Sequence, residues 1–184
     1  MAKGLKNYIR KLEAVQEVNK LYPKRAAVIA LKFVKDRFRQ ENWIGDRTEP
    51  WKPRIFPQNR RNTLTGKGGG SLRRSYRITR STPQLAVIGT DKVYAPAHNE
   101  GMRIPVTEKM RKLFWAKHID AKERSQIKEA QFWLNMATSK KGYIDIPRRK
   151  HIGESQYMVR QIERQVLADY NKALKSWKII SKQG

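Results

Sequence analysis

The sequence contains no cysteine, which excludes disulfide bonds and any metal site built from thiolates. Long apolar runs are also missing. The longest uninterrupted one covers residues 26–31, whereas a helix needs about 20 apolar residues to cross a bilayer. Charged residues interrupt the first 15 positions, where a secretory signal peptide would have its apolar segment. We therefore predict a protein that is not secreted and has no membrane partner.

Acidic residues are scarce. There are 16 Asp and Glu against 41 Lys and Arg, which gives a formal net charge of +25 at pH 7. An excess of this size predicts a polyanionic neighbour: nucleic acid, an acidic protein surface or anionic lipid. A metal-dependent nuclease needs several converging carboxylates. Asp91, Glu100 and Asp145 are the candidates for such a group, and the shortage of acids weighs against this class.

Histidines are few and do not form a pattern. His98, His118 and His151 lack the i, i+4 type of spacing that two-histidine metal sites on helices use, so we interpret each as structural or as part of an interface. The glycine-rich stretch 66–71 does not match a phosphate-binding loop, because its spacing differs from the Walker pattern. We predict no catalytic residue, no cofactor-binding residue and no metal ligand.

The 184 residues have an apolar content of 39%, which is enough for one modest core in a single domain. Apolar residues at helical spacing predict a first helix to about Lys20 and a second from Pro23, because proline is tolerated at a helix start. Alternating residues from Leu72 onward predict two or three consecutive strands. Asp120 and Glu123 form a capping-box pattern that predicts the start of a second helix in the insertion.

These patterns predict N-terminal helices, a small antiparallel sheet, further helices over 107–141 and a long C-terminal helix that packs across the sheet. Thr107 and Ser155 are expected N-caps of helices. Residues 143–147 are expected to form a short strand that ends at proline. The expected segments are N-terminal helices over 1–41, a loop or arm over 42–71, a β-meander over 72–106, the helical insertion over 107–141, and a short strand with the C-terminal helix over 142–184.

Several short motifs occur in a fixed order along most of the chain. They are Trp51, Leu64-Thr65-Gly66, Ser71-Leu72-Arg73-Arg74-Ser75, Val87-Ile88-Gly89-Thr90, Tyr94-Ala95 with His98 and Gly101, and Ile146-Pro147-Arg148-Arg149 with Ile152-Gly153. This order resembles the phage virion morphogenesis family of tail-completion or head–tail joining proteins, which includes the G protein of Mu-like phages. The chain departs from the family pattern in three places: His151 stands where an aromatic residue is usual, Gly68 to Gly70 alter a spacing, and residues 107–141 are an insertion.

The resemblance implies an α+β fold: a small antiparallel sheet packed by a long C-terminal helix, with N-terminal helices and a helical insertion at about 107–141. It also implies a structural, non-enzymatic virion protein that forms part of a ring in the neck, completes the tail and joins it to the DNA-filled head. The implied partners are copies of the same chain, neighbouring neck proteins on the head-closure or portal side and on the tail-terminator or tube side, and the genomic DNA passing through the lumen. Assembly would take place in the cytoplasm of the bacterial host. Lys67, Arg73 and Arg77 are the residues we expect to meet phosphates without reading sequence.

The resemblance also gives roles to other motif residues, which we expect at a subunit interface or in a structural motif: Trp51, Tyr94, His98, Gly101, Arg148 and Arg149. Tyr94, His98 and Gly101 would shape a turn and its packing. Arg149 would hold a carboxylate or backbone carbonyls in the same or a neighbouring subunit, and a purely internal ion pair is the alternative. A free nucleic-acid-binding protein that contacts phosphates non-specifically is the alternative for the whole chain.

Overall fold

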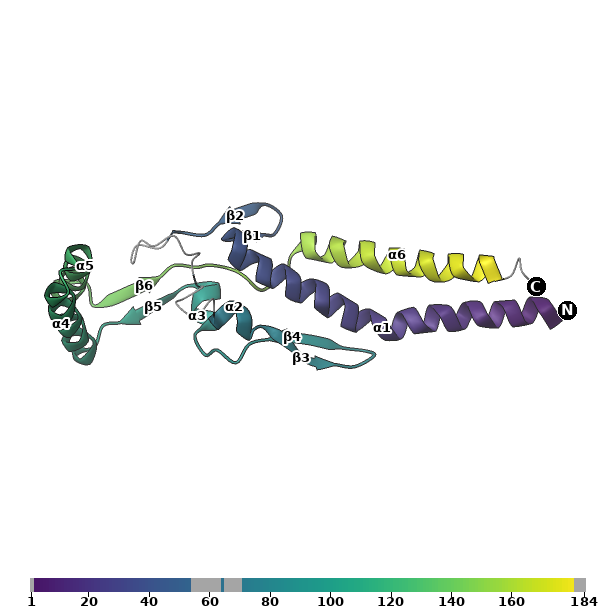
Figure 1. The fold of residues 1–184 in the computed structure, drawn as a ribbon, viewed down its shortest axis with the longest axis horizontal. Coiled ribbons are helices and arrows are strands. Elements are labelled where there is room, and N and C mark those ends of the chain that lie inside the picture. Colours follow the sequence, from purple (N-terminus) through teal and green to yellow (C-terminus); the bar gives the residue numbers. More distant parts are fainter. Residues whose placement is uncertain (1, 54–63, 65–70, 181–184) are drawn as a thin grey trace.

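A computed structural model describes residues 2–53, 64 and 71–180, and confirms the α+β class. The molecule is elongated, and the first and last described residues lie at the same end (Figure 1). The described elements are α1 (Ala2–Gln40), β1 (Asn42–Ile44), β2 (Thr48–Pro50), α2 (Ser71–Ser75), β3 (Arg77–Ser81), β4 (Ala86–Gly89), α3 (Ala95–Glu100), β5 (Met102–Pro105), α4 (Glu108–Glu123), α5 (Ile127–Thr138), β6 (Tyr143–Ile146) and α6 (Gln156–Ile180).

The N-terminal segment is one helix, α1, and the predicted division into two helices is wrong. Pro23 lies inside this helix. A proline removes one backbone hydrogen bond and disturbs the preceding turn, but contacts with α6 hold α1 on both sides of it. Asn19 accepts a hydrogen bond from Tyr170, and Arg25 forms an ion pair with Asp169. Packing against a second helix therefore outweighs the local cost of the proline.

The long C-terminal helix α6 runs antiparallel to α1 along much of its length (Figure 1). Ser155 caps it as predicted, because its Oγ accepts a hydrogen bond from Met158 N at 3.2 Å. The same hydroxyl donates to Ile44 O at 2.6 Å, which ties the start of α6 to β1. The β3–β4 hairpin packs against α1.

The strands form three antiparallel two-stranded ribbons within the described residues: β1–β2, β3–β4 and β5–β6. Within the meander predicted over 72–106, β3 and β4 form a hairpin, but two segments are helical and β5 pairs with β6. Ser71–Ser75 is a helical turn in which Ser75 Oγ donates to Leu72 O at 2.7 Å, and Leu72 is buried in the core. The segment from Ala95 is the short helix α3, with Pro96 in its first turn, a position that suits proline.

The segment 42–71, expected to be a loop, begins with the β1–β2 hairpin, and Trp43 in β1 is buried. Residues 54–63 and 65–70 of that segment lie outside the described residues. The expected strand at residues 143–147 is confirmed as β6, which pairs with β5 in the register Met102 opposite Ile146.

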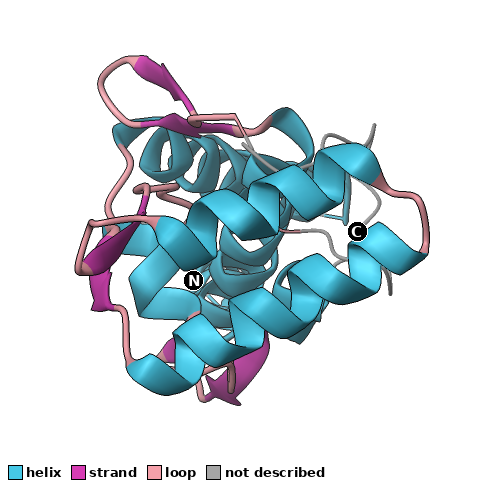
Figure 2. Ribbon diagram, turned by 90° about the vertical axis from the view of Figure 1, so that its left-hand side faces the viewer, coloured by secondary structure: helices cyan, strands magenta, loops and turns pink. Residues whose placement is uncertain are grey.

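The insertion is a pair of helices, α4 and α5, which confirms the helical prediction. Thr107 Oγ1 accepts from Met110 N at 3.3 Å and caps α4. The predicted helix start at Asp120 is wrong: α4 continues to Glu123, and Asp120 forms an ion pair with Arg124 on the following turn. The β5–β6 ribbon carries this helical pair at one end of the molecule (Figure 1). Seen from that end, the two helices lie side by side in front of the body (Figure 2).

The main core lies where α1, α2 and α3 meet. Its buried side chains are Val34, Phe38, Trp51, Leu72, Tyr76 and Ala95. Ring contacts define its geometry: Phe38 and Trp51 pack edge to face with centroids 5.5 Å apart. Among the described residues, no helix is both long enough and apolar enough to cross a membrane.

Candidate functional site

His151 is fully buried at the centre of a polar cluster inside the main core. Its Nδ1 lies 2.8 Å from Arg149 O, and its Nε2 lies 2.9 Å from the Tyr76 hydroxyl. A carbonyl oxygen only accepts, so Nδ1 carries the proton, and Nε2 accepts from Tyr76. Burial lowers the pKa of His151 and raises the pKa of Tyr76 to about 12, so both groups are neutral near pH 7.

His151 also occupies an aromatic environment. Its ring centroid lies 4.8 Å from that of Phe38, 5.5 Å from that of Tyr76 and 6.2 Å from that of Trp51. The imidazole therefore packs as one ring among three aromatic side chains. The Asn99 side chain completes the cluster, because its Oδ1 accepts from His151 N at 2.9 Å and from Ile152 N at 3.1 Å.

Trp51 and Arg149 join two segments that are far apart in sequence. Trp51 Nε1 donates to Lys150 O at 2.8 Å. The buried Arg149 side chain donates from Nε to Lys52 O at 3.1 Å and from Nη2 to Pro53 O at 3.4 Å. Of the alternatives for Arg149, these bonds match the binding of backbone carbonyls in the same chain.

Gly101 lies at the start of β5, against the end of β6. Its φ is +78°, and a Cβ atom there would lie 3.0 Å from Arg148 N and 3.2 Å from Ile146 O. Glycine is the residue that tolerates both the angle and the close backbone approach. Arg148 itself is exposed, so its backbone rather than its side chain takes part in this contact.

Tyr94 and His98 lie next to each other at the start and in the last turn of α3, with ring centroids 5.9 Å apart in an edge-to-face arrangement. Tyr94 is partly exposed. His98 Nδ1 is buried and lacks a hydrogen-bond partner within the described part of the chain. Burial, followed by the positive charge of Arg149, lowers the pKa of His98.

The second feature is a basic surface on α2 and the β3–β4 hairpin. Arg77 and Arg80 are exposed on β3, and Arg73 is half-buried on α2. None of these three side chains has a carboxylate within ion-pair distance among the residues described, in contrast to Arg25, Arg39, Arg103 and Arg124. Lys67, the third basic residue predicted here, lies outside the described residues.

Arg80 was not among the residues predicted from the sequence to meet phosphates, and the length of this basic segment was not predicted either. Between Trp51 and Thr90 the chain has nine Lys and Arg and no Asp or Glu. Counting Asp and Glu residues along the sequence would have revealed this segment. Arginines without acidic neighbours keep their N–H donors available for phosphate oxygens, and such contacts carry no sequence information.

The acidic residues proposed for a nuclease are distributed over different environments. Asp91 and Glu100 line one cavity of about 500 Å³ beside Tyr76. Asp145 instead pairs with Arg103 across the β5–β6 ribbon at 3.0 Å. Within residues 2–53, 64 and 71–180, no group of three or more His, Asp or Glu side chains is arranged to hold a metal ion.

Comparison with protein-family models, with curated proteins and with solved structures found no match to this chain. The family resemblance therefore rests on the order of the motifs alone.

Proposed function

We propose that the chain is a structural virion protein of a tailed phage, a subunit of a ring in the neck that completes the tail and joins it to the DNA-filled head. The observation that carries the proposal is the gathering of motif residues in the cluster around His151. Trp51, Arg149 and the backbone of His98 come from three distant segments and are joined directly: Trp51 to Lys150, Arg149 to Lys52, and Arg149 N to His98 O at 2.7 Å. Short motifs that occur in a fixed order along the chain are expected to meet in the folded protein when together they form one structural unit.

The shape of the subunit supports the same proposal. The α4–α5 pair and the paired ends of α1 and α6 lie at opposite ends of an elongated molecule (Figure 1). Apolar side chains are exposed at both ends, among them Leu5, Ile9 and Leu12 at one and Leu113, Trp115 and Ile119 at the other. Subunits that leave apolar surface exposed gain stability by assembling. Contacts between different ends of successive subunits generate a ring when the rotation closes.

The proposal is tested by imaging particles from a phage strain that lacks this chain. We expect DNA-filled heads and separate tails that do not join. A plasmid-borne copy of the gene should restore joined particles, and a copy encoding Gly101→Val should not, while Gly142→Val serves as the matched control. Normal joined particles from the deletion strain would contradict the proposal.

A free nucleic-acid-binding protein is the second candidate, and the basic surface of α2 and β3 favours it. This candidate predicts strong binding of duplex DNA by the isolated chain, with an affinity that falls steeply as salt rises. Replacing both Arg77 and Arg80 by glutamine should reduce the log–log salt slope by about 2, since each phosphate contact contributes about 1. Arg124→Gln is the control, because Arg124 is already paired with Asp120. A slope unchanged by the double variant would exclude this surface as the DNA contact.

A further inference from the structure

A groove of about 320 Å³ lies between α1 and α6, away from the basic hairpin and from the His151 cluster. Residues three and four apart on α1 form one wall, and residues four apart on α6 form the other, as expected for two helices that face each other. Ile44 of β1 closes one side. The lining side chains are Ile29, Lys32, Phe33, Asp36, Arg37 and Gln40 from α1, and Tyr157, Gln161 and Gln165 from α6.

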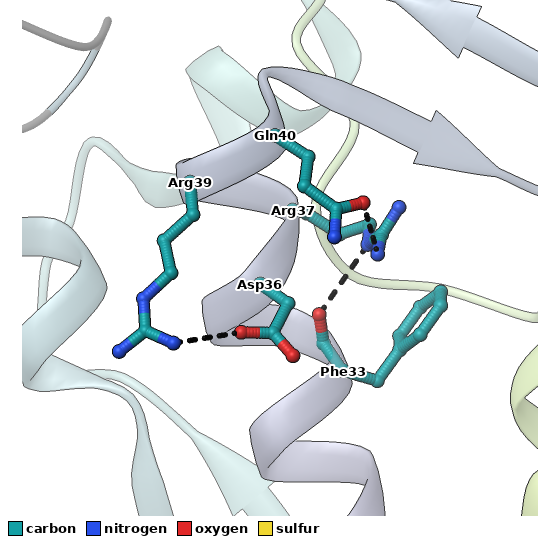
Figure 3. Close-up of polar contacts among 5 residues, drawn as sticks. All are labelled: Phe33, Asp36, Arg37, Arg39 and Gln40. Atoms are coloured by element: carbon teal, nitrogen blue, oxygen red, sulfur yellow. Dashed lines mark hydrogen bonds and ion pairs between the residues drawn. The ribbon is translucent and has the colours of Figure 1, made fainter.

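Arg37 is the unusual member of this lining, because its side chain is only 3% exposed. Three of its N–H groups donate to neutral oxygens: Phe33 O at 3.4 Å, Asn42 Oδ1 at 2.6 Å and Gln40 Oε1 at 3.1 Å. The guanidinium also lies over the Phe33 ring, 4.6 Å from its centroid. Figure 3 shows Arg37 between Phe33 and Gln40.

The positive charge of Arg37 has no carboxylate partner within the described part of the chain. The adjacent Asp36 lines the same groove, but its carboxylate pairs with Arg39 at 3.1 Å (Figure 3) and forms no ion pair with Arg37. The C-terminal end of α1 offers the partial negative charge of the helix dipole, which is about half of an elementary charge. Arginine stays charged in proteins, so the groove holds a buried cation that is only partly compensated.

We propose that this groove binds the carboxylate of an Asp or Glu side chain within a short acidic–apolar segment of a partner protein. A guanidinium fork matches a carboxylate in geometry and charge. Lys32 adds a second cation, and Gln161 adds an amide donor. Gln165 Nε2 already donates to Asp169 Oδ1 at 3.2 Å, so this amide offers its second N–H. Phe33 and Ile44 supply apolar walls for the residues that flank the acid. The inference does not depend on the proposed role in the phage neck.

Nucleic acid fits this groove less well than a peptide does. Nucleic acid presents a phosphate at every nucleotide and requires a continuous basic track. Here Asp36 lines the groove beside Lys32, and Arg37 is buried, so one isolated anionic group is the better match. The continuous basic segment of the chain lies elsewhere, on α2 and β3.

The test is a titration of the full chain followed by NMR, with the side-chain N–H signals of Arg37, Gln161 and Gln165 as reporters. The probe is the capped tripeptide Leu-Glu-Leu, and the matched peptide is Leu-Gln-Leu. We expect saturable shifts of the reporters with the glutamate peptide, with a Kd on the order of 1 mM, and none with the glutamine peptide. Inorganic phosphate at the same concentrations is expected to cause much smaller shifts.

Substitutions of lysines on α1 test whether the peptide binds in the groove, and they leave the buried Arg37 in place. Lys32→Ala should weaken binding of the glutamate peptide about two- to fivefold, which is the effect of one screened surface charge. Lys35→Ala is the control, because it lies on the same helix and does not line the groove. Equal shifts with both peptides, equal shifts with phosphate, or reporters that do not move would each overturn the proposal.

Discussion

The hydrogen bond between His151 and Tyr76 allows a sharp test of the cluster, because both groups are buried and neutral. Replacing His151 by Phe keeps an aromatic ring among Phe38 and Trp51 but leaves the Tyr76 hydroxyl without its acceptor at 2.9 Å. A buried polar group that loses its partner costs about 1–3 kcal/mol. For a chain of this length, each kcal/mol lowers Tm by about 2–4 °C, so we expect Tm to fall by about 2–12 °C at pH 7.5.

The double variant separates this bond from general damage to the core. Tyr76→Phe alone should also destabilise the fold, because His151 Nε2 then lacks a donor. When both partners become apolar, no unpaired group remains at this contact, and we expect the double variant to be more stable than the sum of the single effects by about 1 kcal/mol or more. Urea unfolding of the four proteins measures this coupling. Strict additivity would refute the assignment of His151 as the acceptor for Tyr76.

The same histidine predicts how stability depends on pH. Burial lowers the pKa of His151 below its ordinary value of 6.5, and the same holds for His98. Below about pH 6.5 the unfolded chain therefore binds protons that the folded chain does not. As the pH falls below 6.5, the free energy of unfolding should therefore fall, by at most about 1.4 kcal/mol per pH unit for each histidine, until the folded-state pKa is reached. His151→Phe should remove about half of this slope below pH 6.5, and a slope equal to that of the wild type would contradict the pKa assignment.

Two further predictions concern the backbone contacts that hold the cluster and α6. Gly101→Ala should lower the free energy of unfolding by about 1–3 kcal/mol, because the φ of Gly101 is +78° and the new Cβ would lie 3.0 Å from Arg148 N. Gly142→Ala is the control, because Gly142 has open space around it. Equal unfolding midpoints of the two variants in urea would contradict the prediction. Ser155→Ala should lower the free energy of unfolding by about 1–2 kcal/mol, because it removes the cap of α6 and the hydrogen bond to Ile44 O. A Tm equal to that of the wild type would show that this hydroxyl does not stabilise the helix.

Sequence reasoning succeeded where the signal is local. The caps at Thr107 and Ser155, the helical character of residues 107–141 and the strand over 143–146 all depend on residues within a few positions of one another. The α+β class follows from the same local periodicities, and the basic charge is a property of composition alone. These features do not need knowledge of what each segment packs against.

Only the tertiary structure decided the features that depend on distant partners. Pro23 lies inside α1 because α6 holds the helix on both sides of it, and the residues around Leu72 form a helical turn because Leu72 enters the core. The bonds from Arg149 to Lys52 and Pro53 span nearly 100 residues, with separations of 97 and 96, and no local pattern predicts them. Arg37 has the sequence context of an ordinary surface cation near a helix end. Its burial follows from the packing of Phe33, β1 and α6 around it, so this buried and only partly compensated charge exists only in the folded chain.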